Sequence, residues 1–274
     1  MHSTKVNFNQ ERTWWDGKAS KEELDFDDER INRTLRWRVI ERYLNEARTI
    51  LEVGGGTGAF SLPLARKGFQ VTHADFSPKM IEAAKEKAAG ITTVQFQLAN
   101  ATDLHMFEDR SFDLVLNMDG AISFCGSAAE KAVVECCRVA KQTTIVSVSN
   151  RAWMIPVWLM ESLDVTGSII PAVYEMFHTG FWHKEQYPEN EKLVKDYFPT
   201  LKAFLPNELK TLLENNGMKV IELRAIGSLS NLSPKYWDDY QIMKSYLISS
   251  STYVKNMISK LIRMGLVPDK ELVF

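Results

Sequence analysis

The chain has 274 residues, and its 33 Lys and Arg against 35 Asp and Glu give a formal net charge of −2 at pH 7. With 45% hydrophobic and 25% charged residues it has an ordinary globular composition, which excludes a disordered or fibrous protein. The near-neutral charge argues against a dedicated nucleic-acid-binding protein, which would carry a strong basic excess.

The cysteines and the apolar runs indicate the expected compartment. Cys125 stands alone and Cys136 and Cys137 are adjacent, which gives neither a disulfide framework nor the CxxC spacing of a metal site. The longest apolar run, Ala152–Met160, has nine residues, far below the ~20 that cross a bilayer. The segment Met1–Asp16 is too polar for a signal peptide. We therefore expect a cytoplasmic protein with free thiols, no bound metal and no membrane span.

The first predicted element is a helix over Asp27–Ala47. Apolar side chains recur there at every fourth residue and would lie on one helix face: Ile31, Leu35, Val39 and Tyr43. We take residues 1–47 as an N-terminal helical extension.

Residues 48–150 alternate between strand-like and helix-like patterns. Short apolar runs predict five strands, at Thr49–Val53, Gln70–Asp75, Thr93–Leu98, Phe112–Met118 and Thr143–Val148. Helical patterns separate them at Ala59–Lys67, Pro78–Ala89 and Ser127–Ala140. Strands about 20 residues apart with intervening helices predict an α/β fold, a Rossmann-like, doubly wound and mostly parallel sheet.

The pattern changes after residue 150. Ten of the 54 residues in 151–204 are aromatic, and we interpret this segment as an inserted helical and aromatic lid. Residues 205–274 complete the core with a helix over Pro206–Asn215 and a strand over Lys219–Leu223. They end in two helices, Lys235–Leu247 and Ser251–Met264. The apolar stripe of the last helix fits packing onto the domain best, and a homodimer seam or a membrane-surface face stays open.

The most informative segment is a glycine-rich turn that follows the first predicted strand. It runs from Glu52 to Gly58, with glycines at positions 54, 55, 56 and 58. Glycine permits a positive φ and lets a ligand approach the backbone without a Cβ in the way. A turn of this kind at the carboxyl end of a parallel strand is where α/β proteins bind nucleotides.

Two ligands fit this turn. Gly54, Gly56 and Ala59 satisfy the relaxed GxGxxG/A pattern of dinucleotide sites, and Asp75 lies at about the right distance for a ribose. Glu52 favours a different ligand, because a carboxylate at the strand end attracts the ammonium of an amino-acid moiety and would repel a pyrophosphate.

Four ordered blocks of this chain resemble the class I S-adenosylmethionine-dependent methyltransferases. The motif (D/E)xGxGxG is matched from Glu52 to Gly58, and the family's second-strand acid is matched by Asp75, within a D-x-S-x-x-M phrase that ends at Met80. The segment Ala99–Leu104 is similar to the family's adenine-binding turn, with Asn100 where the family usually has Asp. The segment Phe112–Asp119 is similar to its central strand.

The resemblance implies S-adenosylmethionine as cofactor and a set of residues that bind it. Asp75 would accept hydrogen bonds from both ribose hydroxyls, Phe76 and Met80 would pack near the adenine, and Asn100 would accept from the adenine amino group. From the residues alone, Gly55 and Gly58 fit turn geometry and helix packing as well as ligand contact, and Met80 fits the core. The full predicted set is Glu52, Gly54, Gly55, Gly56, Gly58, Asp75, Phe76, Met80, Asn100, Ala101, Thr102, Asn117 and Met118.

Methyl transfer from a sulfonium is an in-line displacement, and an acidic acceptor also needs a base to expose its lone pair. The candidate bases are His178 and His183 in the lid and Asp119 at the end of the fourth strand, although a lone histidine in an aromatic segment is more often structural. The candidate substrate contacts are aromatic: Trp15, Trp153, Phe181 and Trp182. The alternative for the lid residues among them is that they form the core of a small helical subdomain.

We therefore expect methyl transfer to O, N or C of a small, apolar or aromatic acceptor. One alternative on the same fold is an NAD(P)-dependent oxidoreductase. Tyr240 and Lys244 match the YxxxK spacing of short-chain dehydrogenases, but they lie well past the expected place. A second alternative is a catalytically inactive cofactor-binding module, although a dead site need not keep the intact turn and Asp75.

Overall fold

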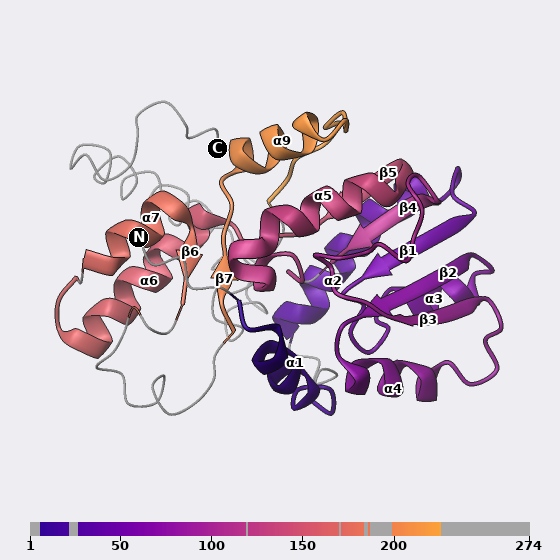
Figure 1. The fold of residues 1–274 in the computed structure, drawn as a ribbon, viewed down its shortest axis with the longest axis horizontal. Helices are drawn as coiled ribbons and strands as arrows, with labels where there is room; N and C mark the ends of the chain where they lie inside the picture. Colours follow the sequence, from indigo (N-terminus) through magenta and orange to yellow (C-terminus); the bar gives the residue numbers. More distant parts are fainter. Residues whose placement is uncertain are drawn as a thin grey trace, which may run out of the picture.

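The computed structural model describes residues 6–21, 27–118, 120–169, 171–183, 186 and 199–225. At its centre is a five-stranded sheet in the order β3-β2-β1-β4-β5, in which all paired strands run parallel (Figure 1). The strands are β1 Thr49–Val53, β2 Gln70–Asp75, β3 Val94–Leu98, β4 Phe112–Asn117 and β5 Ala140–Val146. This order confirms the predicted Rossmann-like α/β fold.

Helices cover both faces of the sheet. Because successive strand residues point to opposite sides, the residues of one strand divide between two core clusters. Leu51 and Val115 belong to a core cluster with α5 and α9, whereas Ile50 and Leu114 belong to a second cluster with α2 and α3. A parallel sheet buried on both faces explains the continuous apolar runs in its strands. The helices are α2 Asp27–Ile40, α3 Ser61–Arg66, α4 Pro78–Lys87, α5 Ala129–Val139 and α9 Pro206–Asn215.

The aromatic-rich segment after β5 forms a small unit beside the sheet (Figure 1). It contains α6 Arg151–Thr166, α7 Pro171–Thr179, and the antiparallel pair β6 Phe181–Trp182 and β7 Leu201–Lys202. The unit has its own hydrophobic cluster, made of Ile155, Trp158, Val173, Met176, Phe177, Trp182 and Ala203. Part of the aromatic content predicted for a lid therefore serves to build its core.

One buried arginine ties this unit to the core. The guanidinium of Arg151, with only 4% of its surface exposed, donates to the carbonyls of His178 at 2.9 Å, Thr179 at 3.1 Å and Ala203 at 3.3 Å. It also pairs with the carboxylate of Glu208 on α9. Since its partners come from α7, from the residue after β7 and from α9, this side chain fixes three segments relative to the start of α6.

The C-terminal part of the prediction is wrong at one strand. Lys219–Leu223 has no strand conformation, and it pairs with no described strand. Val220 packs against the core cluster of α5 and α9, whereas Ile221 and Leu223 are 65% and 46% exposed. The helices predicted over Lys235–Leu247 and Ser251–Met264 lie outside the described residues.

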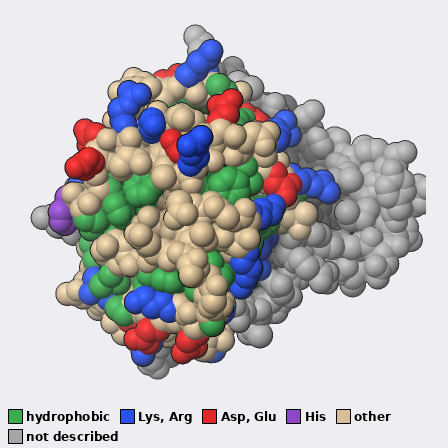
Figure 2. Space-filling model, turned by 90° about the vertical axis from the view of Figure 1, so that its right-hand side faces the viewer, with side chains coloured by type: hydrophobic (Ala, Val, Ile, Leu, Met, Phe, Trp, Pro, Cys, Tyr) green, Lys and Arg blue, Asp and Glu red, His purple; other side chains and the backbone are tan. Residues whose placement is uncertain are grey.

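The surface agrees with the near-zero net charge. On the face in Figure 2, basic and acidic side chains are interspersed around hydrophobic ones. Within the described ranges, no helix has both the length and the apolar character needed to cross a membrane.

The connection between α7 and β6 contains a glycine that the packing requires. Gly180 has φ +70°, and a Cβ built there would lie 1.9 Å from the carbonyl oxygen of Ala203 and 2.5 Å from Nε of Arg151. Gly167, after α6, has nearly the same φ, +68°, but nothing lies within 4 Å of its Cβ position. An alanine at position 167 therefore introduces backbone strain alone, whereas an alanine at position 180 introduces backbone strain and steric overlap.

We predict that Gly180→Ala lowers the free energy of unfolding by about 2–5 kcal/mol, the sum of a left-handed backbone penalty and an overpacking penalty. Gly167→Ala, the matched control, is expected to lose only the backbone part, about 1–2 kcal/mol. Urea denaturation of both variants measures the difference. Equal losses would show that the contact with Ala203 relaxes without cost.

Candidate functional site

A cavity lies at the carboxyl ends of the strands, next to the point where the strand order reverses between β1 and β4. Parallel α/β sheets bind ligands at this point, because the loops diverge there and leave a crevice. Counted together with the open solvent at its mouth, the empty space of the cavity is about 710 Å³. Its lining residues are Phe8, Glu11, Trp15, Gly54, Gly56, Asp75, Phe76, Met80, Ala99, Asn100, Ala101, Met118, Ala121, Phe124 and Cys125.

The glycine turn after β1 forms the floor of the cavity. The N–H groups of Gly54 and Gly55 both donate to the carbonyl of Ala74, at 2.8 and 3.1 Å, which holds the turn against the end of β2. Gly54 and Gly56 have positive φ, 71° and 54°. A Cβ on Gly54 would lie 2.3 Å from that of Ala121, so glycine is required where the turn meets the loop after β4.

Asp75 ends β2 and joins the turn to α4. Its Oδ2 accepts from the N–H of Gly56 at 2.9 Å, and its Oδ1 accepts from the N–H of Ser77 at 2.8 Å. Burial raises the pKa of this carboxyl above its usual value, and the hydrogen bonds from Ser77 and Gly56 act in the opposite direction. The structure thus places a buried acid in the cavity wall where the sequence predicted one.

Glu52 lies outside the lining, beneath the glycine turn. Its Oε2 accepts from the N–H of Ser61 at 2.8 Å, at the start of α3, where a carboxylate is favourable to the helix dipole. The hydroxyl of Ser61 also lies 2.7 Å from Nδ1 of His73, and a Cβ on Gly55 would lie 2.5 Å from the same nitrogen. These buried polar groups support the turn from below.

Gly58, whose Cβ position lies 2.7 Å from Leu62, packs on α3 and does not line the cavity. Among the predicted glycines, Gly54 and Gly56 line the cavity.

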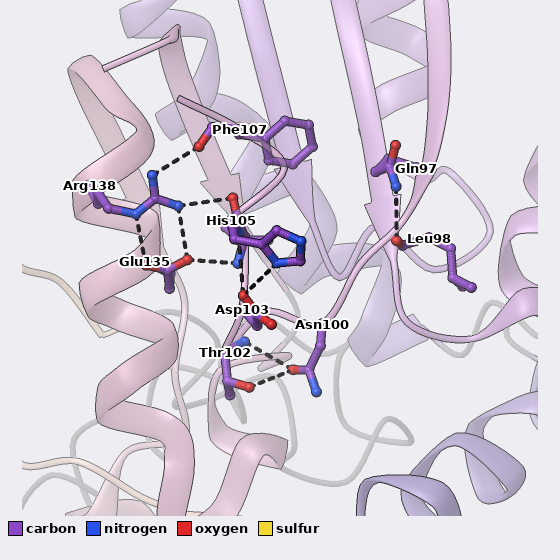
Figure 3. Close-up of polar contacts among 10 residues, drawn as sticks. Gln97, Leu98, Asn100, Thr102, Asp103, His105, Phe107, Glu135 and Arg138 are labelled. Carbon is purple, nitrogen blue, oxygen red and sulfur yellow. Dashed lines mark hydrogen bonds and ion pairs between the residues drawn. The ribbon is translucent and has the colours of Figure 1, made fainter. Parts of the chain in front are cut away.

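The loop after β3 brings Asn100 and Ala101 into the lining. Oδ1 of Asn100 accepts from both the N–H and the hydroxyl of Thr102, each at 3.0 Å (Figure 3), so Thr102 shapes the loop from outside the lining. Two side chains of α5 brace the far end of the loop. Arg138 donates to the carbonyl of Leu104 at 2.9 Å, and Glu135 accepts from the N–H of Leu104 at 2.7 Å.

The loop after β4 supplies the opposite wall. Met118 lines the cavity, but the side chain of Asn117 is fully buried outside the lining, and its Oδ1 accepts from the N–H of Ile122 at 3.2 Å. This bond fixes the loop that leads into the 3₁₀ helix η2, Ser123–Ala128. Three residues of this region line the cavity at i, i+3, i+4 spacing: Ala121, Phe124 and Cys125. None of the three was predicted from the sequence as part of the site.

The N-terminal helix α1, Phe8–Asp16, closes the cavity. Phe8, Glu11 and Trp15 line it at i, i+3, i+7 spacing, so one face of the helix points inward. Asp16 accepts from the hydroxyl of Ser77 and, at 3.2 Å, from the N–H of Lys79, which anchors α1 to the start of α4. Of the three inward residues, only Trp15 was predicted from the sequence as part of the site. The helical spacing of Phe8, Glu11 and Trp15 was the signal that could have found the other two.

The predicted lid residues lie elsewhere. Outside the lining are Trp153, His178, Phe181, Trp182 and His183. Trp182 is buried in the lid cluster, Phe181 packs on the ring of His183 at 5.3 Å between centroids, and Trp153 is 36% exposed. The candidate base Asp119 lies outside the described residues. In the described ranges, no group of three or more His, Cys, Asp and Glu is arranged to hold a metal ion.

A comparison with protein-family models identifies residues 50–143 as a methyltransferase domain. This match covers the five strands through the first part of β5 and includes the glycine turn and Asp75. Together with the fold, this match supports the resemblance of residues 50–143 to the class I S-adenosylmethionine-dependent methyltransferases.

Short stretches of two named relatives match this chain. A demethylmenaquinone methyltransferase from Clavibacter sepedonicus is 47% identical over 66 residues, which are 24% of this chain and 26% of that protein. A demethylmenaquinone methyltransferase from Tropheryma whipplei is 40% identical over 67 residues, 24% of this chain and 27% of that protein. The chain thus spans about a quarter of the length of these relatives.

Solved structures show the same fold. A SAM-dependent methyltransferase from Methanosarcina mazei superposes with a TM-score of 0.50 at 23% identity, over 68% of this chain and 86% of that one. The PH0226 protein from Pyrococcus horikoshii gives 0.51 at 18% identity, over 70% and 84%.

One prediction concerns the thiol in the cavity wall. Burial and the nearby charge of Glu11 raise the pKa of Cys125 to about 12 from the usual 9.0. Since the thiolate is the nucleophile, we expect iodoacetamide at about pH 8 to modify Cys125 at least ~100-fold more slowly in the native protein than in the urea-unfolded chain. Mass spectrometry of the peptide that contains Cys125 measures both rates. Similar rates would contradict the burial of this thiol.

Proposed function

We propose that this protein transfers a methyl group from S-adenosylmethionine to O, N or C of a small organic acceptor. The observation that carries the proposal is the buried carboxylate of Asp75, which lies in the cavity wall within hydrogen-bond distance of Gly56 in the glycine turn. A carboxylate there suits the two hydroxyls of a ribose. The methyltransferase match over residues 50–143 supports the same ligand.

The lining fits the parts of this cofactor. Asp75 is proposed to accept from the ribose hydroxyls, and Phe76, Met80 and Ala101 provide an apolar slot for the adenine. Asn100 is proposed to offer its amide N–H to an adenine ring nitrogen, since its Oδ1 already accepts two hydrogen bonds from Thr102.

The amino-acid end of the cofactor is assigned to the glycine turn and Met118. Gly54 and Gly56 present backbone without a Cβ, which permits a close approach. The other predicted cofactor residues are assigned a supporting role, because each shapes the cavity from outside its lining: Glu52, Gly55, Gly58, Thr102 and Asn117.

When bound, S-adenosylmethionine supplies a methyl group activated by its sulfonium. The contribution proposed for the protein is alignment, which can supply about 7–11 kcal/mol in reactions of this kind. Helix α1 contributes by covering the cavity with Phe8 and Trp15, which excludes water from the reacting atoms.

The remaining assignments are proposals from the sequence. His178, His183 and Asp119 stay candidate bases, and Trp153, Phe181 and Trp182 stay candidate substrate contacts that would have to reach the acceptor from the lid. The division into an extension (1–47), a core (48–150), a lid (151–204) and a completing segment (205–274) also stays a prediction. Three further expectations also stay predictions: a homodimer, a cytoplasmic location, and a small-molecule rather than a nucleic-acid partner.

The Asp75 assignment predicts a loss of cofactor affinity. Asp75→Ala is expected to weaken binding of S-adenosylhomocysteine by about 1–3 kcal/mol, because the ribose hydroxyls lose their acceptor. Glu46→Ala, at an exposed carboxylate outside the cavity lining, is the matched control and should bind normally. Isothermal titration calorimetry measures both. An unchanged affinity of Asp75→Ala for S-adenosylhomocysteine would contradict the proposal that Asp75 binds the ribose.

Turnover is tested by transfer of labelled methyl from S-adenosylmethionine to a panel of small acceptors. Binding of S-adenosylhomocysteine without any labelled product would favour the inactive module, and binding of NAD alone would favour the oxidoreductase.

The raised pKa of Asp75 predicts a pH dependence. The ionised carboxylate is the better acceptor for the ribose hydroxyls, so affinity is present above the pKa and is lost as the pH falls through it. Because burial raises this pKa, the loss should begin at a higher pH than for an ordinary carboxyl, with a slope of up to about tenfold per pH unit. Calorimetric titrations with S-adenosylhomocysteine between about pH 8 and pH 5 measure it. Asp75→Asn should bind more weakly and with a flat profile; an equal slope in this variant would assign the titration to another group.

A further inference from the structure

A row of three side chains crosses the sheet beneath the glycine turn. In the strand register, Glu52 of β1 pairs with His73 of β2, and His73 pairs with Phe96 of β3. Register partners point to the same face of a parallel sheet, so the three side chains lie side by side. The imidazole of His73 is fully buried, and the ring of Phe96 meets it edge to face at 5.4 Å between centroids. Its neighbours on both strands therefore limit the movement of this imidazole.

Helix α3 contacts the same imidazole. Nδ1 of His73 lies 2.7 Å from the hydroxyl of Ser61, the first residue of α3, and 3.8 Å from Oε2 of Glu52. Nε2 is buried and has no hydrogen-bond partner among the described residues. A buried nitrogen without a partner lowers the free energy of unfolding, so packing alone would favour an apolar side chain here. A reason for histidine at this place lies on the other edge of the ring, which carries Nδ1 and Cε1.

The glycine turn lies directly on this edge of the imidazole. A Cβ built on Gly55 would lie 2.5 Å from both Nδ1 and Cε1 of His73, and 3.1 Å from Oε2 of Glu52. Unlike Gly54 and Gly56, Gly55 does not have a positive φ. Glycine is therefore required at position 55 by the space that the imidazole occupies, and not by the backbone conformation.

We propose that His73 is a positioning residue for the cofactor, because its ring edge sets how closely the glycine turn lies against the sheet. The turn carries Gly54 and Gly56 into the cavity lining, and the N–H of Gly56 donates to the carboxylate of Asp75. A displaced turn would change both the lining and this hydrogen bond. The inference rests on the proposed function, in which this turn and Asp75 bind S-adenosylmethionine.

The test is a double-mutant cycle that measures binding of S-adenosylhomocysteine by calorimetry on the full chain. Gly55→Ala is expected to bind about tenfold more weakly, because the new methyl group displaces the turn from the ring. His73→Ala is expected to bind about fivefold more weakly, because the turn loses the surface it lies on. In the double variant the methyl group occupies space that the ring has left. It should bind more tightly than either single variant and within about threefold of the native chain, since contacting residues couple by such factors.

Two further variants separate positioning from stability. Val71 lies two residues before His73 on the same face of β2, is 3% exposed and belongs to the cluster of α2 and α3. Val71→Ala should lower the thermal unfolding temperature, yet leave the affinity unchanged and fail to rescue Gly55→Ala. His73→Asn keeps an amide that can reach the hydroxyl of Ser61, and it should bind within about threefold of the native chain.

Four results would overturn the proposal. They are native affinity in Gly55→Ala, native affinity in His73→Ala, a double variant that binds no more tightly than Gly55→Ala, and a loss of affinity in Val71→Ala as large as that in His73→Ala. Failure of the proposed function appears separately, as a native chain that does not bind S-adenosylhomocysteine. The thermal unfolding temperatures of the same four proteins of the cycle then still report whether Gly55 and His73 are in contact, because only contacting residues give a non-additive change.

Discussion

The site depends on the carboxylate of Asp75, which accepts from the turn after β1 through Gly56 and from the start of α4 through Ser77. These two bonds fix the end of β2 relative to the two loops that flank it. A buried acid is costly unless it is hydrogen-bonded, and both backbone donors meet that requirement. The same arrangement leaves the acid in the cavity wall, where we propose that the hydroxyl groups of a ligand complete its hydrogen bonding.

Around this acid the cavity is built in two layers. Gly54, Gly56 and Asp75 lie in the wall itself, while Glu52 and Asn117 are buried behind it and bind backbone N–H groups of the neighbouring loops. Some polar residues at strand ends thus line the cavity, while others are buried behind it and hold the neighbouring loops in place. Residue type alone does not separate the two roles, because both use a carboxylate or an amide at the end of a buried strand.

The aromatic segment after β5 shows a similar division. Its tryptophans and phenylalanines suggested a substrate lid, yet Trp158, Phe177 and Trp182 form the core of a small unit that Arg151 joins to α7, to the residue after β7 and to α9. Apolar content gives the same signal for a core and for a ligand wall, since both remove nonpolar surface from water. The aromatic wall of the cavity comes instead from α1 and η2.

By itself the sequence determined the alternating order of strands and helices, the parallel sheet and the position of the glycine turn, because these follow from local periodicity and from the backbone freedom of glycine. It also predicted that Asp75, Phe76 and Asn100 lie near the ends of their strands, and the structure has them in the cavity lining. Only the tertiary structure decided that Phe8 and Glu11 face Phe124 and Cys125, and that Lys219–Leu223 forms no strand. Those features depend on which distant segments pack together, and such packing has no local signature in the chain.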